Sequence, residues 1–142
     1  KSGNPVIDIV IGEYKDKCIK TGIDFTYDFH YPEKGVIDAF DMSIVLFNAL
    51  QNACEAAQKT SHGYVRLKAF RKKNAYIIEI TNSCAGRITV EPGKLPATDK
   101  DNAQAHGYGL KNIKRIAEKY YGGINIDSVG NTFKLNIMMM LE

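Results

Sequence analysis

The sequence contains no tryptophan, three cysteines and four prolines among its 142 residues, and its longest apolar run, 137–141, is five residues long. Cys18, Cys54 and Cys84 are odd in number and form no Cys-x-x-Cys pair, which excludes a disulfide framework and the common zinc motifs. The apolar run is far shorter than the roughly 20 residues that cross a bilayer. A net charge of +3, with one compact basic run at 71–73, argues against a nucleic-acid partner.

What remains is the composition of one ordinary domain, with 44% hydrophobic and 25% charged residues. A chain of this length buries enough surface to fold without disulfides or a structural metal. The chain begins at Lys1 rather than at a methionine, and Asn4-Pro5 is a typical helix start. We therefore expect residues 1–4 to be the end of a linker and residues 5–142 to form the domain.

Helical and strand periodicities alternate along the chain. Asp41 is a candidate cap for a long helix rich in alanine and leucine, and the apolar stretch at 76–80 is typical of a central strand. The predicted elements are a helix from 5 to Gly22, a strand at 23–31, a helix at 42–60, strands at 64–72 and 75–81, a helix that opens at 106–109 and ends at Gly122, and strands at 124–129 and 132–141. This order buries best as an α/β two-layer sandwich, in which three helices cover one face of a mixed β-sheet.

Residues 84–105 have no periodicity and contain two prolines and two glycines. Structureless stretches of this length are uncommon inside compact domains and are typically functional. We therefore predict a lid at about 84–106.

Three polar residues share one face of the long helix. Asn48, Asn52 and Glu55 are spaced at i, i+4 and i+7, within about 60° of one another at 100° per residue, on a helix that is otherwise almost wholly apolar. A solvent-facing stripe is one interpretation, but asparagine is a poor helix former and needs another reason to be there. Its carboxamide oxygen is a hard, neutral ligand that suits Mg²⁺ with its other ligands from water and phosphate.

Three further segments are candidate ligand contacts. Asn82 directly follows the central strand, where an amide can meet the edge of adenine, although a turn asparagine is the plainer interpretation. Gly107 and Gly109 precede a helix, so their backbone N–H groups can approach phosphate oxygens. Thr132 follows a Gly-Asn turn typical of a hairpin and can offer a hydroxyl group to a base.

These segments occur in one order along the chain, and together they resemble the GHKL nucleotide-binding domains of gyrase, histidine kinases and MutL. The stretch 46–56 is similar to the family's N box, and 107–113 is similar to its G2 box. The opening Gly3-Asn4-Pro5-Val6-Ile7-Asp8 and the Asn-Ala-x-Glu-Ala ending of the N box resemble the quorum-sensing, AgrC-like sensor kinases that read peptide pheromones.

The resemblance implies ATP and Mg²⁺ as cofactors, with a lid over the nucleotide. It assigns Asn48 and Asn52 to catalysis and ATP binding, with Asn52 as the metal ligand. The remaining nucleotide contacts that it implies are Glu55, Asn82, Gly86, His106, Gly107, Tyr108, Gly109, Leu110 and Thr132.

Two positions depart from the family pattern. The usual Asp-x-Gly-x-Gly box is here Asn82-Ser83-Cys84-Ala85-Gly86, with an amide for the carboxylate and without the middle glycine. A neutral acceptor holds an amine less strongly than a carboxylate, so we expect weak nucleotide affinity. Many histidine kinases also carry a phosphate-contacting lysine or histidine where Glu55 stands, and a glutamate acts there only through the metal or water.

The resemblance also identifies a position that distinguishes kinases from ATPases in the family. ATP-hydrolysing members place a catalytic glutamate four residues before the metal-binding asparagine, where this chain has Asn48. An amide is no useful base at neutral pH, so hydrolysis is expected to be slow. Phosphoryl transfer to a histidine needs mainly positioning and charge neutralisation.

None of His30, His62 and His106 lies in mid-helix beside an acidic residue, as the family's phosphoacceptor does. We therefore expect the acceptor on a dimerisation helix before Lys1, with relay to a response regulator. The parent is expected to be a homodimeric bacterial plasma-membrane receptor with this domain, not itself membrane-inserted, in the cytoplasm. A catalytically degraded nucleotide-binding or partner-docking module is the alternative, and an ATPase is a third hypothesis.

Overall fold

The computed structural model describes residues 2–32, 36–86 and 103–142, with side chains described from residue 109 onwards in the last range. The described part of the chain forms these elements in order: α1 (Pro5–Lys20), β1 (Asp24–Asp28), α2 (Ala39–Gln58), β2 (Tyr64–Lys72), β3 (Ala75–Ser83), α3 (Ala103–Lys119), β4 (Gly123–Val129) and β5 (Thr132–Met140).

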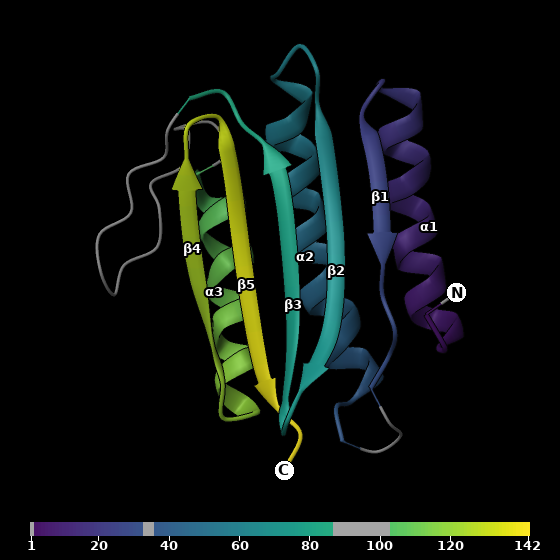
Figure 1. Ribbon diagram of the computed structural model, residues 1–142, viewed down its shortest axis with the longest axis vertical. Helices are drawn as coiled ribbons and strands as arrows, with labels where there is room; N and C mark the ends of the chain where they lie inside the picture. Colours follow the sequence, from purple (N-terminus) through teal and green to yellow (C-terminus); the bar gives the residue numbers. More distant parts are fainter. Residues whose placement is uncertain (1, 33–35, 87–102) are drawn as a thin grey trace.

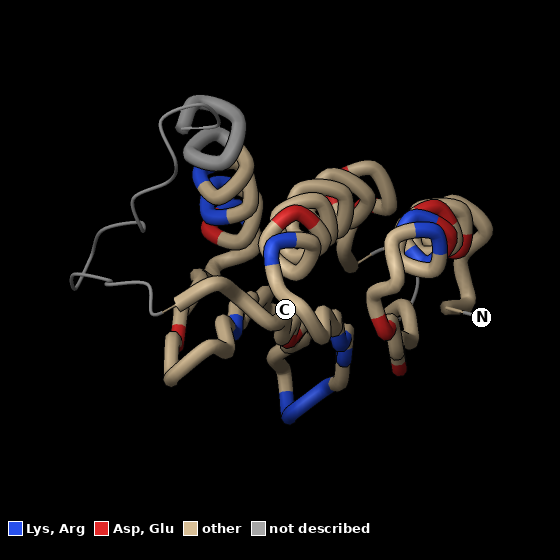
Figure 2. The backbone as a smooth tube through the Cα atoms, turned by 90° about the horizontal axis from the view of Figure 1, so that it is seen from above, with Lys and Arg blue, Asp and Glu red and all other residues tan. Residues whose placement is uncertain are grey.

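The strands form one mixed sheet in the order β1-β2-β3-β5-β4 (Figure 1). β1 pairs with β2 in parallel, and the other neighbours are antiparallel. β3 lies in the middle of the sheet, which confirms the prediction of a central strand. All three helices cover the same face, so that the molecule has a helical layer and a sheet layer (Figure 2). The predicted two-layer sandwich is therefore confirmed.

The core lies between the two layers. Alternate residues of β2 and β3 point toward the helices, among them Val65, Leu67, Ile78 and Ile80, which are buried. α2 buries apolar residues along most of its length because it is covered by the sheet and flanked by α1 and α3. This central position fixes the polar residues of α2 relative to both neighbouring helices.

Two helix starts test the capping predictions. Asn4 caps α1 as predicted, since its Oδ1 accepts hydrogen bonds from the backbone N–H groups of Val6 and Ile7. The prediction that Asp41 caps the second helix is wrong, because α2 begins three residues earlier than expected with Asp38 as its cap.

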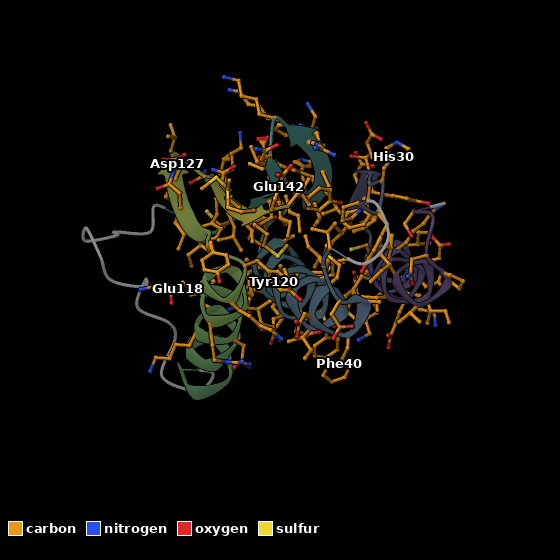
Figure 3. The ribbon with its side chains drawn as sticks, turned by 90° about the horizontal axis from the view of Figure 1, so that it is seen from below. His30, Phe40, Glu118, Tyr120, Asp127 and Glu142 are labelled. Atoms are coloured by element: carbon orange, nitrogen blue, oxygen red, sulfur yellow. The ribbon has the colours of Figure 1, made fainter. Side chains whose placement is uncertain are left out.

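Asp41 instead joins α2 to the end of α3. Its Oδ2 accepts hydrogen bonds from Lys119 Nζ at 2.8 Å and from the Tyr120 hydroxyl at 2.6 Å. The Tyr120 hydroxyl also accepts a hydrogen bond from the backbone N–H of Asp38. Tyr120 accordingly lies at the junction of the two helices, as Figure 3 shows.

The predicted strand at 23–31 is shorter in the structure, where β1 spans Asp24–Asp28. Its expected inward alternation also fails at Tyr27, whose side chain is exposed. In the described part of the sheet β1 is an edge strand, because it pairs with β2 alone. The hairpin turn at Gly130-Asn131 is confirmed, and Gly130 has the positive φ of +59° that glycine adopts without strain.

Among the described helices, none has the length and apolar character needed to cross a membrane.

Candidate functional site

The asparagine stripe of α2 faces the first half of α3. A Cβ atom placed on Gly109 would lie 3.4 Å from Asn48 Oδ1 and 3.4 Å from Asn52 Nδ2. Asn48 donates from Nδ2 to the Ile44 carbonyl at 2.8 Å, which orients its carboxamide along the helix. The structure therefore brings together Asn48, Asn52 and Gly109, three residues that the sequence predicted for one site.

Gly109 lies within α3 and not before it. The sequence predicted a helix that opens at 106–109, but α3 begins at Ala103, so Gly107 and Gly109 are helical residues. Ala103 and Gln104 are good helix formers, which explains why the helix extends further toward its N-terminus than a glycine-based boundary suggests. The prediction of a glycine loop in front of the helix is wrong at this point.

Leu110, the residue after Gly109, is buried in the hydrophobic core. It anchors α3 while its neighbour Gly109 lies against the asparagines. The side chains of His106 and Tyr108 and most of the predicted lid lie outside the described residues.

Asn82 lies at the end of β3 and is 2% exposed. Its register partners are Val65 and Phe133, which places it on the sheet face that the helices cover. Asn82 Nδ2 donates to the Ser83 carbonyl at 2.9 Å. This bond uses one of the two Nδ2 hydrogens and orients the carboxamide, whose Oδ1 is the acceptor that it can offer to a ligand.

Ser83 is a residue of this region that the sequence did not single out. Its hydroxyl accepts a hydrogen bond from the Tyr64 backbone N–H at 3.0 Å and pairs with the Thr60 hydroxyl at 2.9 Å. These bonds join the end of β3 to the start of β2 and to the turn after α2. The only sequence signal for this connecting role of Ser83 is its position next to Asn82.

Thr132 is not brought to Asn82. It pairs with Ser83 in the sheet register, one residue along from Asn82, and therefore lies on the opposite face. Its hydroxyl hydrogen-bonds the Tyr64 hydroxyl at 2.8 Å. The predicted contact between Thr132 and a base held at Asn82 has no support in this geometry.

Gly86 follows the same strand end, in a turn where its N–H donates to the Cys84 carbonyl. Its φ of +92° favours glycine, since other residues rarely adopt it. Cys84 is buried, and burial raises the pKa of its thiol. The chain therefore makes a tight turn at 84–86, directly after β3 and at the start of the predicted lid.

Glu55 is linked to α1. Gln51 Nε2 donates to Glu55 Oε1 at 2.6 Å, and Gln51 Oε1 accepts a hydrogen bond from the Tyr14 hydroxyl at 2.9 Å. Burial, with nearby acidic groups, raises the pKa of Tyr14, so this hydroxyl stays a donor at neutral pH. Gln51 and Tyr14 were not predicted; the i, i+4 spacing of Gln51 and Glu55 was the available signal.

The side-chain oxygen and nitrogen atoms described in this region fit only one kind of metal site. In the described part of the chain, no group of three or more His, Cys, Asp or Glu side chains could hold a metal ion. Asn52 offers a neutral oxygen beside Asn48 and Gly109. Such a residue suits a magnesium ion that takes its other ligands from phosphate and water.

Two of the histidines are on the surface. His30 and His62 are exposed, and His30 Nε2 lies 3.1 Å from Asp28 Oδ1. His30 follows the edge strand β1, and His62 lies in the turn after α2.

Several solved structures share this fold. The catalytic domain of histidine kinase ThkA matches with a TM-score of 0.73 and 21% identity, over 99% of this chain and 93% of that chain. ThkA in complex with response regulator protein TrrA matches with a TM-score of 0.73 and 19% identity, over 96% and 40%. Full-length ShkA in complex with AMPPNP matches with a TM-score of 0.71 and 17% identity, over 94% and 29%.

At sequence identities of 17–21%, the similarity to these structures shows the fold alone. None of the curated protein sequences compared with the chain matches it. A family model described as the GHKL domain matches residues 37–140, from the start of α2 to the end of β5. Because this match covers most of the chain and includes Asn48, Asn52, Asn82 and Gly109, the protein belongs to the GHKL domain family.

Proposed function

We propose that this chain is the ATP-binding catalytic domain of a sensor histidine kinase. The observation that carries the proposal is the approach of Gly109 to Asn48 and Asn52, which sets the glycine-containing start of α3 against the polar stripe of α2. The fold shared with histidine kinase catalytic domains, one of them in complex with AMPPNP, supports it.

Each contact has a distinct chemical task. Asn82 accepts a hydrogen bond from the adenine amine through Oδ1, while one Nδ2 hydrogen is bonded to the Ser83 carbonyl and orients the carboxamide. The N-terminal part of α3, which carries Gly107 and Gly109, faces the phosphates with the positive end of the helix dipole. Asn52 would hold Mg²⁺ through its amide oxygen, and a bound Mg²⁺ would neutralise phosphate charge. Glu55 would not contact phosphate directly, since a carboxylate repels it, and would reach the nucleotide only through the metal or water.

The proposed reaction is phosphoryl transfer to a histidine outside this chain. A neutral imidazole nitrogen attacks the γ-phosphorus, and the bond between the γ-phosphorus and the bridging oxygen breaks to release ADP. The imidazole proton is lost to solvent. Asn48 positions the triphosphate without taking a proton, because an amide is not a base near neutral pH.

The proposal includes the partners of such a domain. The phosphoacceptor lies on dimerisation helices, and a response regulator receives the phosphoryl group; the solved complex of ThkA with TrrA supports a regulator as partner. The segments at 3–8 and 52–56 favour a pheromone-reading, AgrC-like receptor of the plasma membrane with this domain in the cytoplasm.

The first test is ATP binding by calorimetry, with and without Mg²⁺, for the chain and for Asn52→Ala. We expect binding that requires Mg²⁺ and is weakened about tenfold or more by the substitution, since a charge-assisted ligand bond is lost. Asn125→Ala, at an exposed position of β4, is the matched control and should bind as the original chain does. Equal affinity for ATP in the original chain and in Asn52→Ala would contradict the assignment of Asn52 as the metal ligand.

The second test separates a kinase from an inert module. The dimerisation helices are supplied in trans with ATP labelled at the γ-phosphate, and labelled phosphohistidine is measured. Label on the histidine supports the kinase. ATP binding without any label would instead favour the degraded nucleotide-binding module that the altered box at 82–86 suggests.

A further inference from the structure

Two cysteines of the chain meet in the interior between α1 and α2. Cys18 Sγ and Cys54 Sγ are 3.2 Å apart, although the two residues are 36 positions apart in the sequence. Both side chains are buried, at 0% and 3% exposure. A disulfide joins its sulfur atoms at about 2.05 Å, so the pair is about 1.2 Å from bonding distance.

We propose that Cys18 and Cys54 are a redox-sensitive pair whose oxidation joins α1 to α2 by a reversible disulfide bond. The proposal rests on the contact between the two sulfur atoms and is independent of the proposed kinase function.

The position of α1 in the fold allows the bond to close. α1 packs mainly against α2 and β1, at the edge of the helical layer, whereas α2 is held by the sheet and by α3 as well (Figure 1). The required approach of the sulfur atoms is therefore a small shift of an edge helix. It leaves the sheet and the α2–α3 contact at Gly109 in place.

The surroundings of the pair make the reaction slow and selective. Burial raises the pKa of both thiols, so little of the reactive thiolate is present at neutral pH. A small, uncharged oxidant must also enter through local opening of α1. Once one sulfur atom has reacted, the other is its nearest partner, which favours a disulfide over further oxidation.

Hydrogen peroxide is an oxidant of the required class. One thiol loses its proton, the resulting thiolate attacks a peroxide oxygen, and the O–O bond breaks to give a sulfenic acid and hydroxide, which takes up the lost proton to form water. The second sulfur atom then attacks the sulfenic sulfur; the S–S bond forms, the S–O bond breaks, and a second water molecule leaves with the remaining thiol proton. Two thiols and one peroxide thus give one disulfide and two water molecules, with the sulfur atoms oxidised and the peroxide reduced.

The bond would have a local consequence for α2. Cys54 lies between Asn52 and Glu55 in the sequence, and Tyr14 of α1 already contacts this turn through Gln51. A covalent link at Cys54 adds a second connection from α1 to the same turn. Oxidation therefore restrains the segment that carries the asparagine stripe.

The test treats the reduced chain with hydrogen peroxide and measures its intact mass and its peptide map without reductant. We expect a monomer that has lost two hydrogen atoms, a linked peptide pair containing Cys18 and Cys54, and full reversal by dithiothreitol. Linked peptides that contain Cys84, disulfide-linked dimers, or only oxygen additions would each overturn the proposal.

Cys84→Ser is the matched control, because Cys84 is also buried but lies at the end of β3. It should form the bond as the original chain does, whereas Cys18→Ser and Cys54→Ser should not. If a single variant fails to fold, the peptide map of the original chain still decides the matter. The thermal midpoint gives an independent readout: we expect it to rise on oxidation, and a fall would show that the fold cannot accommodate the bond.

Discussion

Gly109 lies in a helix interior, where alanine is the more favourable residue, and it contacts the asparagines of the proposed site. Alanine is more favourable than glycine there by about 1 kcal/mol. The added methyl group would be 3.4 Å from Asn48 Oδ1 and Asn52 Nδ2, an ordinary contact distance. A glycine at this position therefore lowers helix stability and leaves free space beside the site.

Gly109→Ala should accordingly raise the free energy of unfolding by about 0.5–1 kcal/mol while it weakens ATP binding several-fold. Urea denaturation and calorimetry on the same preparation measure the two effects. A variant that gains stability and binds ATP with unchanged affinity would show that the space beside the asparagines is not used by the nucleotide.

Gly122 shows the reverse case, in which a glycine has no room for a side chain. A Cβ atom there would be 1.8 Å from the Met138 carbonyl oxygen, which belongs to the backbone of β5 and cannot move aside cheaply. Gly122→Ala should cost about 2–3 kcal/mol or more. Gly123→Ala, with nothing within 4 Å of the added atom, is the control for urea denaturation and should stay near the original stability.

At the scale of elements, the α2–α3 pair depends on the ionised Asp41. Burial alone would raise the pKa of this carboxyl group, but the hydrogen bonds from Lys119 and Tyr120 outweigh it and hold the pKa below its ordinary value. A carboxyl group with a lowered folded-state pKa stabilises the fold above its unfolded pKa of about 3.9, and this contribution is lost as the pH falls through the folded value.

Asp41→Asn should therefore be less stable than the original chain at neutral pH, and the difference should stay constant down to about pH 5 and shrink below about pH 4. Unfolding measured across this range in both proteins checks the prediction. Asp127→Asn, on exposed β4, provides the baseline for removal of a carboxylate. A stability difference independent of pH would mean that the charge of Asp41 does not stabilise the helix pair.

The sequence predicted most elements because their signals are local. The Asn4 cap, the alternation in β2 and β3 and the Gly130 turn depend on neighbours within a few residues, so the chain itself carries the information. The contact between Asp41 and Tyr120, the face on which Thr132 lies and the meeting of Cys18 with Cys54 depend on how distant segments pack. Only the folded structure brings those partners together.

At the scale of the whole molecule, the asparagine stripe was predictable as one face of a helix, but its partner was not. Periodicity put Asn48 and Asn52 side by side, and the G2-like stretch pointed to a glycine near phosphate. That Gly109 contacts both asparagines from inside α3 follows from the docking of two helices on one sheet. The predicted helix start at 106–109 was too late, because the helix formers Ala103 and Gln104 precede the glycines and extend α3.

The whole domain should bind ATP without hydrolysing it at an appreciable rate. Asn48 provides no proton acceptor for water, so phosphate release should stay near the rate of ATP alone even at ATP concentrations that saturate binding. A phosphate-release assay at saturating ATP and Mg²⁺, without an acceptor, checks this prediction. Steady release that Asn48→Ala abolishes would favour the ATPase hypothesis.

The single parallel pair in the sheet also determines the order in which the chain can fold. β4 and β5 are joined by a two-residue turn. Asp24 of β1, in contrast, pairs with Tyr64 of β2, and the whole of α2 lies between them in the sequence. The entropic cost of closing that long loop delays the pairing until α2 has docked. The N-terminal edge should therefore be the last part to assemble and the first to exchange its amide hydrogens.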